Sequence, residues 1–460
     1  MTRHQPPPSE SDTNATPLRG AWQAAHVGEA ERALLRRDSA AFLHQSVSTP
    51  CLTAIAKAEG IWLEDLSGRR LMDFHGNSAH TVGYGHPRVK QAIAEQLEKL
   101  SFSPRRFTCE RSVELAETLG RITPGTLSKV LFTTGGSDAV EVAIKLARAA
   151  TGRFKTLSFW DAFHGAGFGA SAVGGEALFR AGPHGPMMPG TEHVAPFACY
   201  RCPYGWPERD GKPLLDQCRL SCASMVRYVL EREGDVAAVI AEPMRATPVP
   251  PPPGYWQAVR DACDATGTLL IFDEIPTGLG RTGRMFSCEH DGVVPDILVI
   301  GKGLGGGVLP IAAVVARPEL DVGADWAFGH YTHEKNPVTA AAALATIAVI
   351  EDEGLVDGAA RLGAIALDRL EALKARCPAV GDVRGRGLMI GVELVEDRAA
   401  KRPAKALAER TLYEALARGL SFKTTFGNTL TLAPPLVITE PELMQALDIL
   451  EEALGAALAA

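Results

Sequence analysis

The sequence lacks the features that mark membrane-spanning, secreted or nucleic-acid-binding proteins. Its longest run of small and apolar residues, 338–350, falls short of the roughly 20 residues that a bilayer-spanning helix needs. The N-terminal residues contain no apolar stretch of the kind found in secretory signals. Lysine and arginine (47) are fewer than aspartate and glutamate (54), so the formal charge of −7 gives no general attraction to nucleic acid or anionic lipid. We therefore expect a cytoplasmic protein without a membrane or nucleic-acid partner.

The sequence also gives no sign of a disulfide framework. Nine cysteines, an odd number, in a long chain without a secretory signal favour reduced thiols. Four of them, Cys199, Cys202, Cys218 and Cys222, have a spacing that a tetrahedral zinc site would tolerate. Because these pairs lie in an apparent insertion before a helix, we expect free thiols and no bound metal, with structural zinc as the alternative.

What is present is the composition of a globular protein, with 46% hydrophobic and 22% charged residues. The first 25 residues are rich in proline, serine and threonine, which predicts a disordered tail over 1–25. We expect residues 26–85 to form the N-terminal part of a small domain and 86–335 a large domain. Residues 336–460 would complete the small domain at the C-terminal end.

Short apolar runs through the middle of the chain predict buried strands. They lie at 156–159, 236–241, 269–272, 297–300 and 311–316, separated by glycine- and proline-rich turns or helical stretches. Runs without polar alternation are typical of strands covered on both faces. The last third reads as mainly helical. The pattern predicts an α/β fold, with a large, mainly parallel sheet covered by helices on both faces and a smaller α+β domain built from both chain ends.

Polar residues follow several of these strands, where ligands of open α/β sheets bind. Gly136 and Ser137 stand between an expected strand and an expected helix, and free backbone amides there suit an anion such as phosphate. A plain helix N-cap is the alternative. Asp273 and Glu274 end the strand at 269–272, where a carboxylate could face a protonated ring nitrogen or simply cap a helix.

Lys302, between two glycines after the strand at 297–300, is a candidate nucleophile. A partly desolvated amine has a lowered pKa, as a Schiff-base lysine requires, whereas a flexible surface loop is the alternative. Residues 301–306 also match the glycine pattern of dinucleotide sites, but the helix that such a site needs does not follow. Phe163, shortly after another strand, could stack on a ring. An anion site, an aromatic, an acid and a lysine together indicate pyridoxal 5′-phosphate.

With residues 273–283 (DEIPTGLGRTG) and the later Gly301-Lys302-Gly303, the sequence resembles the class III, fold-type I pyridoxal-phosphate enzymes. The resemblance implies that Lys302 carries the cofactor and moves protons and that Asp273 pairs with its ring nitrogen. Gly136 and Ser137 would hold its phosphate, Phe163 would stack on its ring, and Glu242 would support the site. Thr332 matches a threonine that reaches the phosphate of a neighbouring subunit, which implies a homodimer with shared sites.

Departures from the family pattern point to the substrate. Many family aminotransferases have a carboxylate-binding arginine where this chain has Thr431, and threonine cannot replace that fork. The adjacent Arg105 and Arg106 suit a dianion, although surface arginines are the alternative. Together with the segment 73–87 and residues 332–335, these two arginines resemble a subgroup of ammonia-lyases that act on (R)-1-hydroxy-2-aminoethylphosphonate.

The expected activity is therefore elimination of water and release of ammonia from that compound, giving phosphonoacetaldehyde in phosphonate catabolism. Within enzymes, the alternatives are an ω-amine or ω-amino acid:pyruvate aminotransferase and a phosphoethanolamine-type phospho-lyase. From another class, a zinc-dependent interaction protein on a vestigial enzyme fold would bind zinc and no cofactor.

Overall fold

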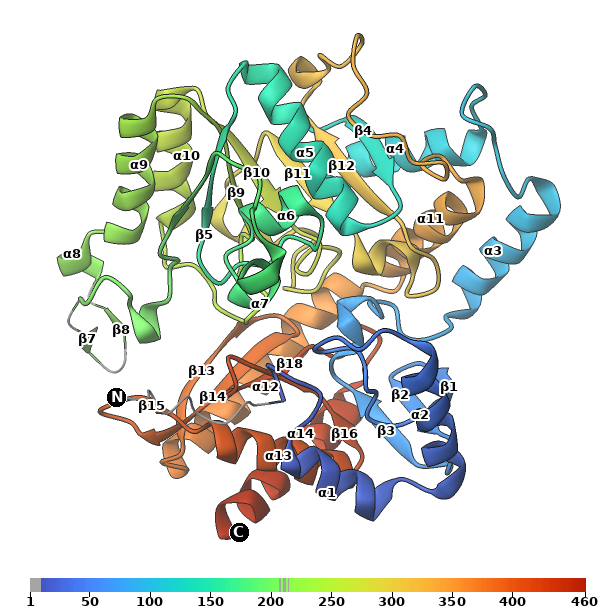
Figure 1. Cartoon of the computed structure of the whole chain (residues 1–460), viewed down its shortest axis with the longest axis vertical. Coiled ribbons are helices and arrows are strands. Elements are labelled where there is room, and N and C mark those ends of the chain that lie inside the picture. Colours follow the sequence, from blue (N-terminus) through green and yellow to red (C-terminus); the bar gives the residue numbers. More distant parts are fainter. Residues whose placement is uncertain (1–9, 207, 210–211, 214) are drawn as a thin grey trace. The chain divides into compact units, whose positions relative to one another are not determined.

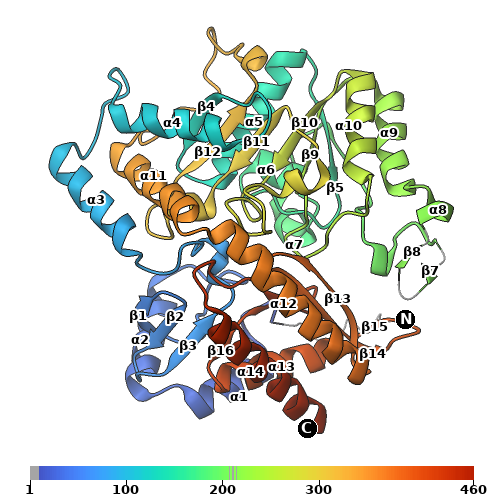
Figure 2. The ribbon, with the colours of Figure 1, turned by 180° about the vertical axis from the view of Figure 1, so that it is seen from behind.

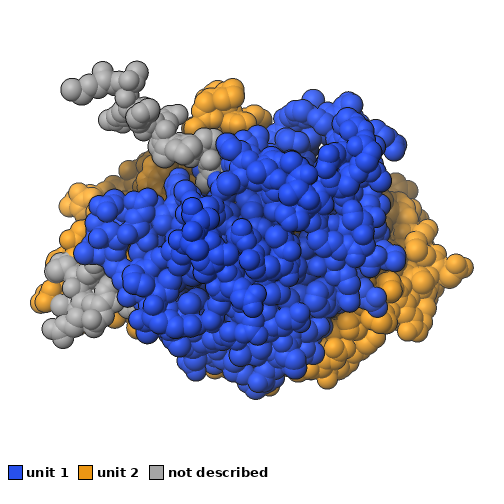
Figure 3. All heavy atoms as spheres, turned by 90° about the horizontal axis from the view of Figure 1, so that it is seen from below, with its two compact units in different colours: residues 1–76, 360–460 blue, residues 77–359 orange. Residues whose placement is uncertain are grey.

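The computed structural model describes residues 10–206, 208–209, 212–213 and 215–460, and it divides into two compact units (Figures 1 and 2). Unit 1 comprises residues 1–76 and 360–460, and unit 2 comprises residues 77–359. In Figure 3 residues from both ends of the chain, coloured blue, form one continuous body. The chain therefore passes from one unit to the other after residues 76 and 359, whereas the sequence suggested domain boundaries after residues 85 and 335.

The later boundary has a physical reason in the packing of helix α11 (Pro337–Asp352). This helix packs against α3 (Pro87–Lys99) and α4 (Glu110–Ile122), so it belongs to unit 2. Small side chains along α11 make it apolar on all sides, as expected for a helix surrounded by protein.

Unit 2 is built on a seven-stranded sheet in the order β4-β12-β11-β10-β9-β5-β6. Strand β12 runs antiparallel to both neighbours, and the other neighbouring pairs are parallel. The strands are β4 (Lys129–Thr133), β5 (Lys155–Phe159), β6 (Thr191–Val194), β9 (Val236–Ala241), β10 (Leu269–Asp273), β11 (Ile297–Ile300) and β12 (Ala312–Ala316). Each of the five predicted apolar runs is a strand of this sheet.

Helices cover both faces of the sheet, which explains why its central strands are apolar without alternation. Alternate residues such as Ile240, Ile271 and Val299 form one buried cluster with α5 (Gly136–Thr151) and α6 (Phe168–Val173). On the other face Phe272 meets Trp256 of α10 (Tyr255–Thr266), with ring centroids 4.7 Å apart. The remaining elements of unit 2 are α7 (Ala177–Arg180), β7 (Glu208–Arg209), β8 (Lys212–Pro213), α8 (Leu215–Cys218) and α9 (Ser221–Glu233). The predicted α/β fold class is confirmed by this arrangement.

Unit 1 contains two further sheets, ordered β1-β2-β3-β16 and β13-β14-β18-β17, with β15 paired to β14. Strand β16 lies parallel to β3, so the first sheet joins the two ends of the chain. The strands are β1 (Ile55–Glu59), β2 (Trp62–Asp65), β3 (Arg70–Asp73), β13 (Val380–Arg386), β14 (Met389–Asp397), β15 (Arg402–Pro403), β16 (Leu420–Ser421), β17 (Lys423–Thr425) and β18 (Thr429–Leu432). The helices are α1 (Pro17–His26), α2 (Glu29–Ala41), α12 (Leu355–Arg376), α13 (Lys405–Ala417) and α14 (Glu440–Ala459).

Helix α1 corrects the expectation of a disordered tail over 1–25. Thr16 caps the helix by accepting a hydrogen bond from the Arg19 amide at 3.1 Å, and Pro17 occupies the first turn. Trp22 is buried, which gives the helix an apolar anchor. Residues 1–9 of the expected tail lie outside the described residues.

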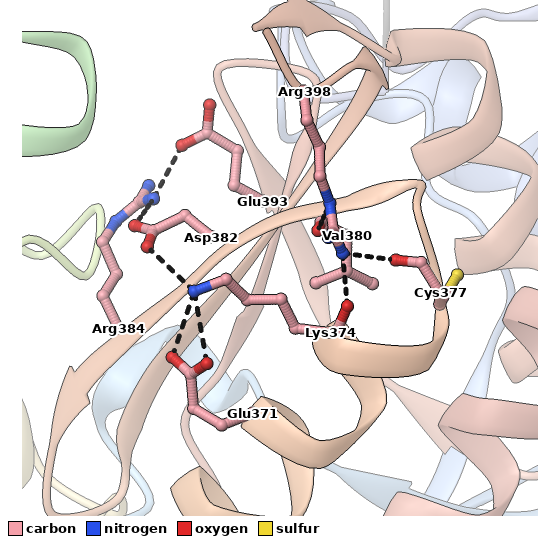
Figure 4. Close-up of polar contacts among 8 residues, drawn as sticks. All are labelled: Glu371, Lys374, Cys377, Val380, Asp382, Arg384, Glu393 and Arg398. Carbon is pink, nitrogen blue, oxygen red and sulfur yellow. Dashed lines mark hydrogen bonds and ion pairs between the residues drawn. The ribbon is translucent and has the colours of Figure 1, made fainter. Parts of the chain in front are cut away.

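A network of paired charges holds the second sheet of unit 1 (Figure 4). Arg384 of β13 donates to Asp382 at 3.0 Å and to Glu393 of β14 at 2.6 Å, and both carboxylates are buried. Lys374 lies within 4.0 Å of Asp382. Each of these buried carboxylates therefore meets an opposite charge.

Candidate active site

Six of the seven strands of this sheet run in the same direction and end at one edge, and the predicted cofactor residues of unit 2 other than Thr332 lie at five of these ends. Asp273 is the last residue of β10, which lies between β9 and β11. The others lie just beyond a strand: Gly136 and Ser137 after β4, Phe163 after β5, Glu242 after β9 and Lys302 after β11. Because the carboxyl ends of parallel strands share an edge, the fold places these groups where open α/β sheets bind ligands.

Asp273 is buried, and protein donors hold both of its carboxylate oxygens. His164 Nδ1 lies 2.8 Å from Oδ2, and the Ile275 amide donates to Oδ1 at 3.0 Å. A carboxylate can only accept, so Nδ1 of His164 carries the proton of this bond. The geometry fixes a negative charge at the end of β10, as stabilisation of a protonated ring nitrogen requires.

Lys302 combines solvent access with a crowded environment. The residue is exposed, yet protein atoms surround its side chain closely enough to lower the pKa of its ammonium, while Asp273 and Glu242 act in the opposite direction. Its φ of +46° is unusual for a residue with a side chain. A Cβ on the neighbouring Gly303 would approach Thr81 Oγ1 to 2.1 Å, so only glycine fits there. The backbone thus fixes a lysine whose amine is easier to deprotonate than usual.

Glu242 is a second buried carboxyl group at this edge. Burial raises its pKa, and the nearby positive charges of His164, Arg245 and Lys302 oppose that rise while Asp273 reinforces it. The backbone after it is held because Trp256 Nε1 donates to the Pro243 carbonyl at 2.7 Å. Glu242 therefore belongs electrostatically to the group formed by Asp273 and Lys302.

The N-terminus of α5 suits an anion. Gly135 is its N-cap and supplies no side-chain hydrogen bond, so the helix-capping alternative for Ser137 or Asp138 fails. Ser137 Oγ instead accepts from the Ala166 amide at 3.0 Å, which links this turn to the segment after β5. A Cβ on Gly136 would lie 2.7 Å from Ile275 Cδ1, so glycine permits the close approach of the loop after β10. The first amides of α5 and its positive end remain available to a phosphate.

Phe163 has an accessible ring in the same region. It is 39% exposed, and its centroid lies 4.5 Å from that of Phe179. An exposed ring next to a buried His–Asp pair is suited to stacking on a planar cofactor. An uncapped helix end, an accessible ring, a fixed carboxylate and an amine of lowered pKa together fit pyridoxal 5′-phosphate.

The substrate arginines and Thr332 lie apart from this group in sequence, and the structure ties them to each other. Arg105 and Arg106 are the central residues of a turn closed by Phe107 N donating to Pro104 O at 2.8 Å. Arg105 also meets the segment that contains Thr332, because its Nη1 donates to His330 Nδ1 at 2.7 Å. The assignments of Arg105 and Arg106 to substrate and of Thr332 to a neighbouring subunit stay predictions.

Three further predicted features have a definite structural place. Thr431 is buried in β18 of unit 1, where its hydroxyl shares a hydrogen bond with that of Thr425. The clustered cysteines Cys199, Cys202, Cys218 and Cys222 line one small cavity, and none of the four forms a disulfide bond. Within the described part of the chain, His, Cys, Asp and Glu side chains form no group of three or more arranged to hold a metal ion. Over the same residues no helix has the length and apolar character needed to cross a membrane.

Sequence reasoning missed the contribution of His164. Its place next to Phe163, just after a strand, was a usable signal, but an isolated histidine there is typical of a surface residue. The Ile275 amide gave no signal, since every residue other than proline carries one. Both contacts depend on how the segments after β5 and β10 turn at the sheet edge.

Comparisons with known proteins identify the family of the chain. A family model described as aminotransferase class-III matches residues 44–454. The (R)-1-hydroxy-2-aminoethylphosphonate ammonia-lyase of Vibrio splendidus is 45% identical over 97% of this chain and 95% of its own length. The leucine/methionine racemase of Thermococcus litoralis is 39% identical over 88% of this chain and 91% of its own length. Relatives with different reactions thus share the same framework.

Solved structures give the same result for the fold. An (S)-enantioselective ω-transaminase from Thermomicrobium roseum superposes with a TM-score of 0.84 and 33% identity, covering 93% of this chain and 98% of that one. An amine transaminase from an uncultivated Pseudomonas species, solved in a PLP-bound form, superposes with a TM-score of 0.83 and 32% sequence identity. The match covers 91% of this chain and 98% of that one. The resemblance inferred from residues 273–283 and Lys302 is confirmed. The chain belongs to the class-III aminotransferase family.

Proposed function

We propose that this enzyme releases ammonia from (R)-1-hydroxy-2-aminoethylphosphonate and forms phosphonoacetaldehyde, a step of phosphonate catabolism. Its cofactor is pyridoxal 5′-phosphate, in agreement with the family and the fit of the sheet-edge residues. The observation that carries the proposal is the 45% identity to the Vibrio splendidus ammonia-lyase over 97% of the chain. The site supports it by placing a carboxylate and a lysine of lowered pKa together.

The residues of the chain divide the work as follows. When bound, the cofactor supplies an electron sink for negative charge on the carbon next to the amine. Lys302, more readily neutral than an ordinary lysine, accepts a proton from that carbon. Asp273, held by His164, keeps negative charge at the ring-nitrogen side of the site. The amides at the start of α5 and the ring of Phe163 orient the group.

The overall reaction balances without a second substrate. Loss of a proton from the aminomethyl carbon and of hydroxide from the neighbouring carbon removes one water. The resulting enamine takes up a proton at the carbon that carried the hydroxyl group, and water then releases ammonia and leaves the aldehyde. No keto acid is consumed. This agrees with Thr431, whose hydroxyl is engaged by Thr425 and which offers no guanidinium to a carboxylate.

The test follows ammonia and aldehyde from the purified holoenzyme with the hydroxy-aminophosphonate and no keto acid. We expect both products in equal amounts. Aldehyde that appears only with added pyruvate would identify an aminotransferase, and inorganic phosphate released from phosphoethanolamine would identify a phospho-lyase. Zinc without cofactor absorbance would indicate an interaction protein.

We include in the proposal a cytoplasmic homodimer in which Thr332 reaches the neighbouring site. Large apolar side chains on unit 2 are exposed in the single chain, including Phe107, Phe168 and Trp326 at 62%, 72% and 64%. Such side chains are candidates for burial in an interface. None of the nine cysteines, which all lie in the described residues, forms a disulfide bond, as a reducing compartment allows. Light scattering at micromolar concentration should give the mass of two chains, and a monomer would refute this part.

A further inference from the structure

Two turns distant in sequence meet at Arg105. The first presents Arg105 and Arg106 between Pro104 and Phe107. The second is closed by Glu334 N donating to Tyr331 O at 3.1 Å. Arg105 Nη1 donates to His330 Nδ1 at 2.7 Å, and its Nε lies 3.4 Å from Glu334 Oε1. One guanidinium thus contacts a histidine and a carboxylate of the same segment.

Other contacts hold both turns in place around this pair. The rings of Phe102 and His333 meet edge to face at 5.2 Å. Ser112 Oγ donates to the Lys335 carbonyl at 3.0 Å, and Lys145 Nζ donates to the Phe328 carbonyl at 3.1 Å. These contacts do not involve Arg105, so the turns have their own anchors. The guanidinium can therefore change partners while the turns stay in place.

The ion pair of Arg105 with Glu334 is loose, whereas its bond to His330 is short. At 3.4 Å the pair exceeds ordinary charge-assisted hydrogen-bond lengths, and the arginine side chain is 35% exposed. The Glu334 side chain is 16% exposed, so the pair lies between a surface pair, which contributes about 0–1 kcal/mol, and a buried one. Arginine has only donors, so His330 Nδ1 is the acceptor and supports the guanidinium without a charge. A stronger anion can replace Glu334 at little expense.

The local charge matches a dianion. Arg105, Arg106 and Lys335 contribute three positive charges and Glu334 one negative charge within these two turns, a sum of +2. A phosphonate is doubly negative and can accept two parallel hydrogen bonds from one guanidinium. A carboxylate carries half that charge. The two turns thus form a receptor whose own carboxylate is a weaker ligand than the proposed substrate.

We propose that Glu334 occupies the guanidinium of Arg105 in the absence of substrate and that the phosphonate of the substrate displaces it. An anion then binds Arg105 only if its interaction with the guanidinium is stronger than that of Glu334. This inference rests on the proposed function and adds the residue that tunes selection of the anion. Glu334 is a positioning residue, since it acts through Arg105.

The first test is calorimetric titration of the holoenzyme with methylphosphonate, a probe that is not turned over. Glu334→Gln removes the competing charge, so we expect the Kd to fall about three- to fivefold, the equivalent of a surface ion pair. Arg105→Gln removes the fork and should raise the Kd about tenfold. In the Arg105→Gln background, Glu334→Gln should shift the Kd by less than about twofold, because no guanidinium remains to compete for. An equal gain in both backgrounds, or a weaker affinity in Glu334→Gln, overturns the proposal.

A matched control is Glu114→Gln, which breaks another surface pair, Arg111 with Glu114 at 2.7 Å. This variant should leave the methylphosphonate Kd unchanged. With the hydroxy-aminophosphonate, Glu334→Gln should act on KM rather than on kcat. If ammonia is released but the methylphosphonate Kd is the same in Glu334→Gln, the proposed competition is refuted and the proposed function is not. If the Kd responds as expected but no ammonia forms, the proposed function fails and the competition stands.

Discussion

Charged side chains serve different roles in the second sheet of unit 1 and around Lys302 at the strand ends of unit 2. In unit 1 Arg384 binds Asp382 and Glu393 at 3.0 and 2.6 Å, so both buried carboxylates are compensated. In unit 2, no hydrogen bond or ion pair links the side-chain charges of Lys302 or Glu242 to any residue that the structure describes. Burial raises the pKa of Glu242 and lowers that of Lys302, so each group shifts towards its uncharged form. Paired charges support a fold, whereas charges that are close but unpaired are ready to exchange protons.

The largest effect should come from Lys302→Ala. Loss of the group that accepts the proton is expected to lower ammonia release by about 10³-fold or more. The free energy of unfolding of the cofactor-free protein should change by less than about 1 kcal/mol, because the Lys302 side chain forms no hydrogen bond or ion pair with the described residues that the substitution would break. Rate assays and denaturant titration measure the two quantities. Lys129→Ala, at a surface pair with Asp321, is the control and should affect neither.

Arg384→Met should lower the free energy of unfolding and have little effect on the rate of ammonia release per folded molecule. It removes the guanidinium that the buried carboxylates of Asp382 and Glu393 share. Weaker contacts remain, to Lys374 at 4.0 Å and to the Asn428 amide at 3.3 Å, so we expect a loss of about 3 kcal/mol of stability. Arg361→Met is the matched control, since its pair with Glu440 is exposed and contributes about 0–1 kcal/mol. Equal losses in the two variants by denaturant titration would remove the contrast between the units.

Glu274 is a buried carboxyl group of unit 2 whose effect on stability should depend on pH, because burial raises its pKa to about 7. Between the unfolded value of about 4.3 and about 7, the native state holds a proton that the unfolded chain has lost. Stability from this group is therefore present at low pH and is lost as pH rises through that window. We expect a fall of about 1–3 kcal/mol from pH 5 to pH 8 that Glu274→Gln abolishes. Unchanged pH dependence in the variant would assign the slope to other groups.

The smallest effect concerns His164, which donates to Asp273 at 2.8 Å. His164→Phe should lower kcat about tenfold, as expected for loss of one oriented hydrogen bond to a charged group. His164→Asn keeps a donor at the Nδ1 position and should restore part of the loss. The visible spectrum of the bound cofactor provides a second readout. An identical spectrum and kcat in His164→Phe would exclude a positioning role.

Sequence patterns predicted the centre of the molecule well, because its strands are continuous apolar runs with diagnostic residues at their ends. Asp273 and Lys302 were selected in this way, and the structure has both at the ends of neighbouring strands. Helix α1 was missed because proline, serine and threonine dominate the tail, although Thr16 and Pro17 are typical helix-start residues. The Arg105–Glu334 pair was not predictable, since long-range folding alone brings these two turns together.

The central claim is that this enzyme eliminates water before it releases ammonia. The most direct measurement is the mass of the aldehyde formed by the holoenzyme from (R)-1-hydroxy-2-aminoethylphosphonate without a keto acid. We expect phosphonoacetaldehyde, which has lost the hydroxyl group, together with an equal amount of ammonia. An aldehyde that still carries the hydroxyl group and forms only in proportion to added pyruvate would contradict it.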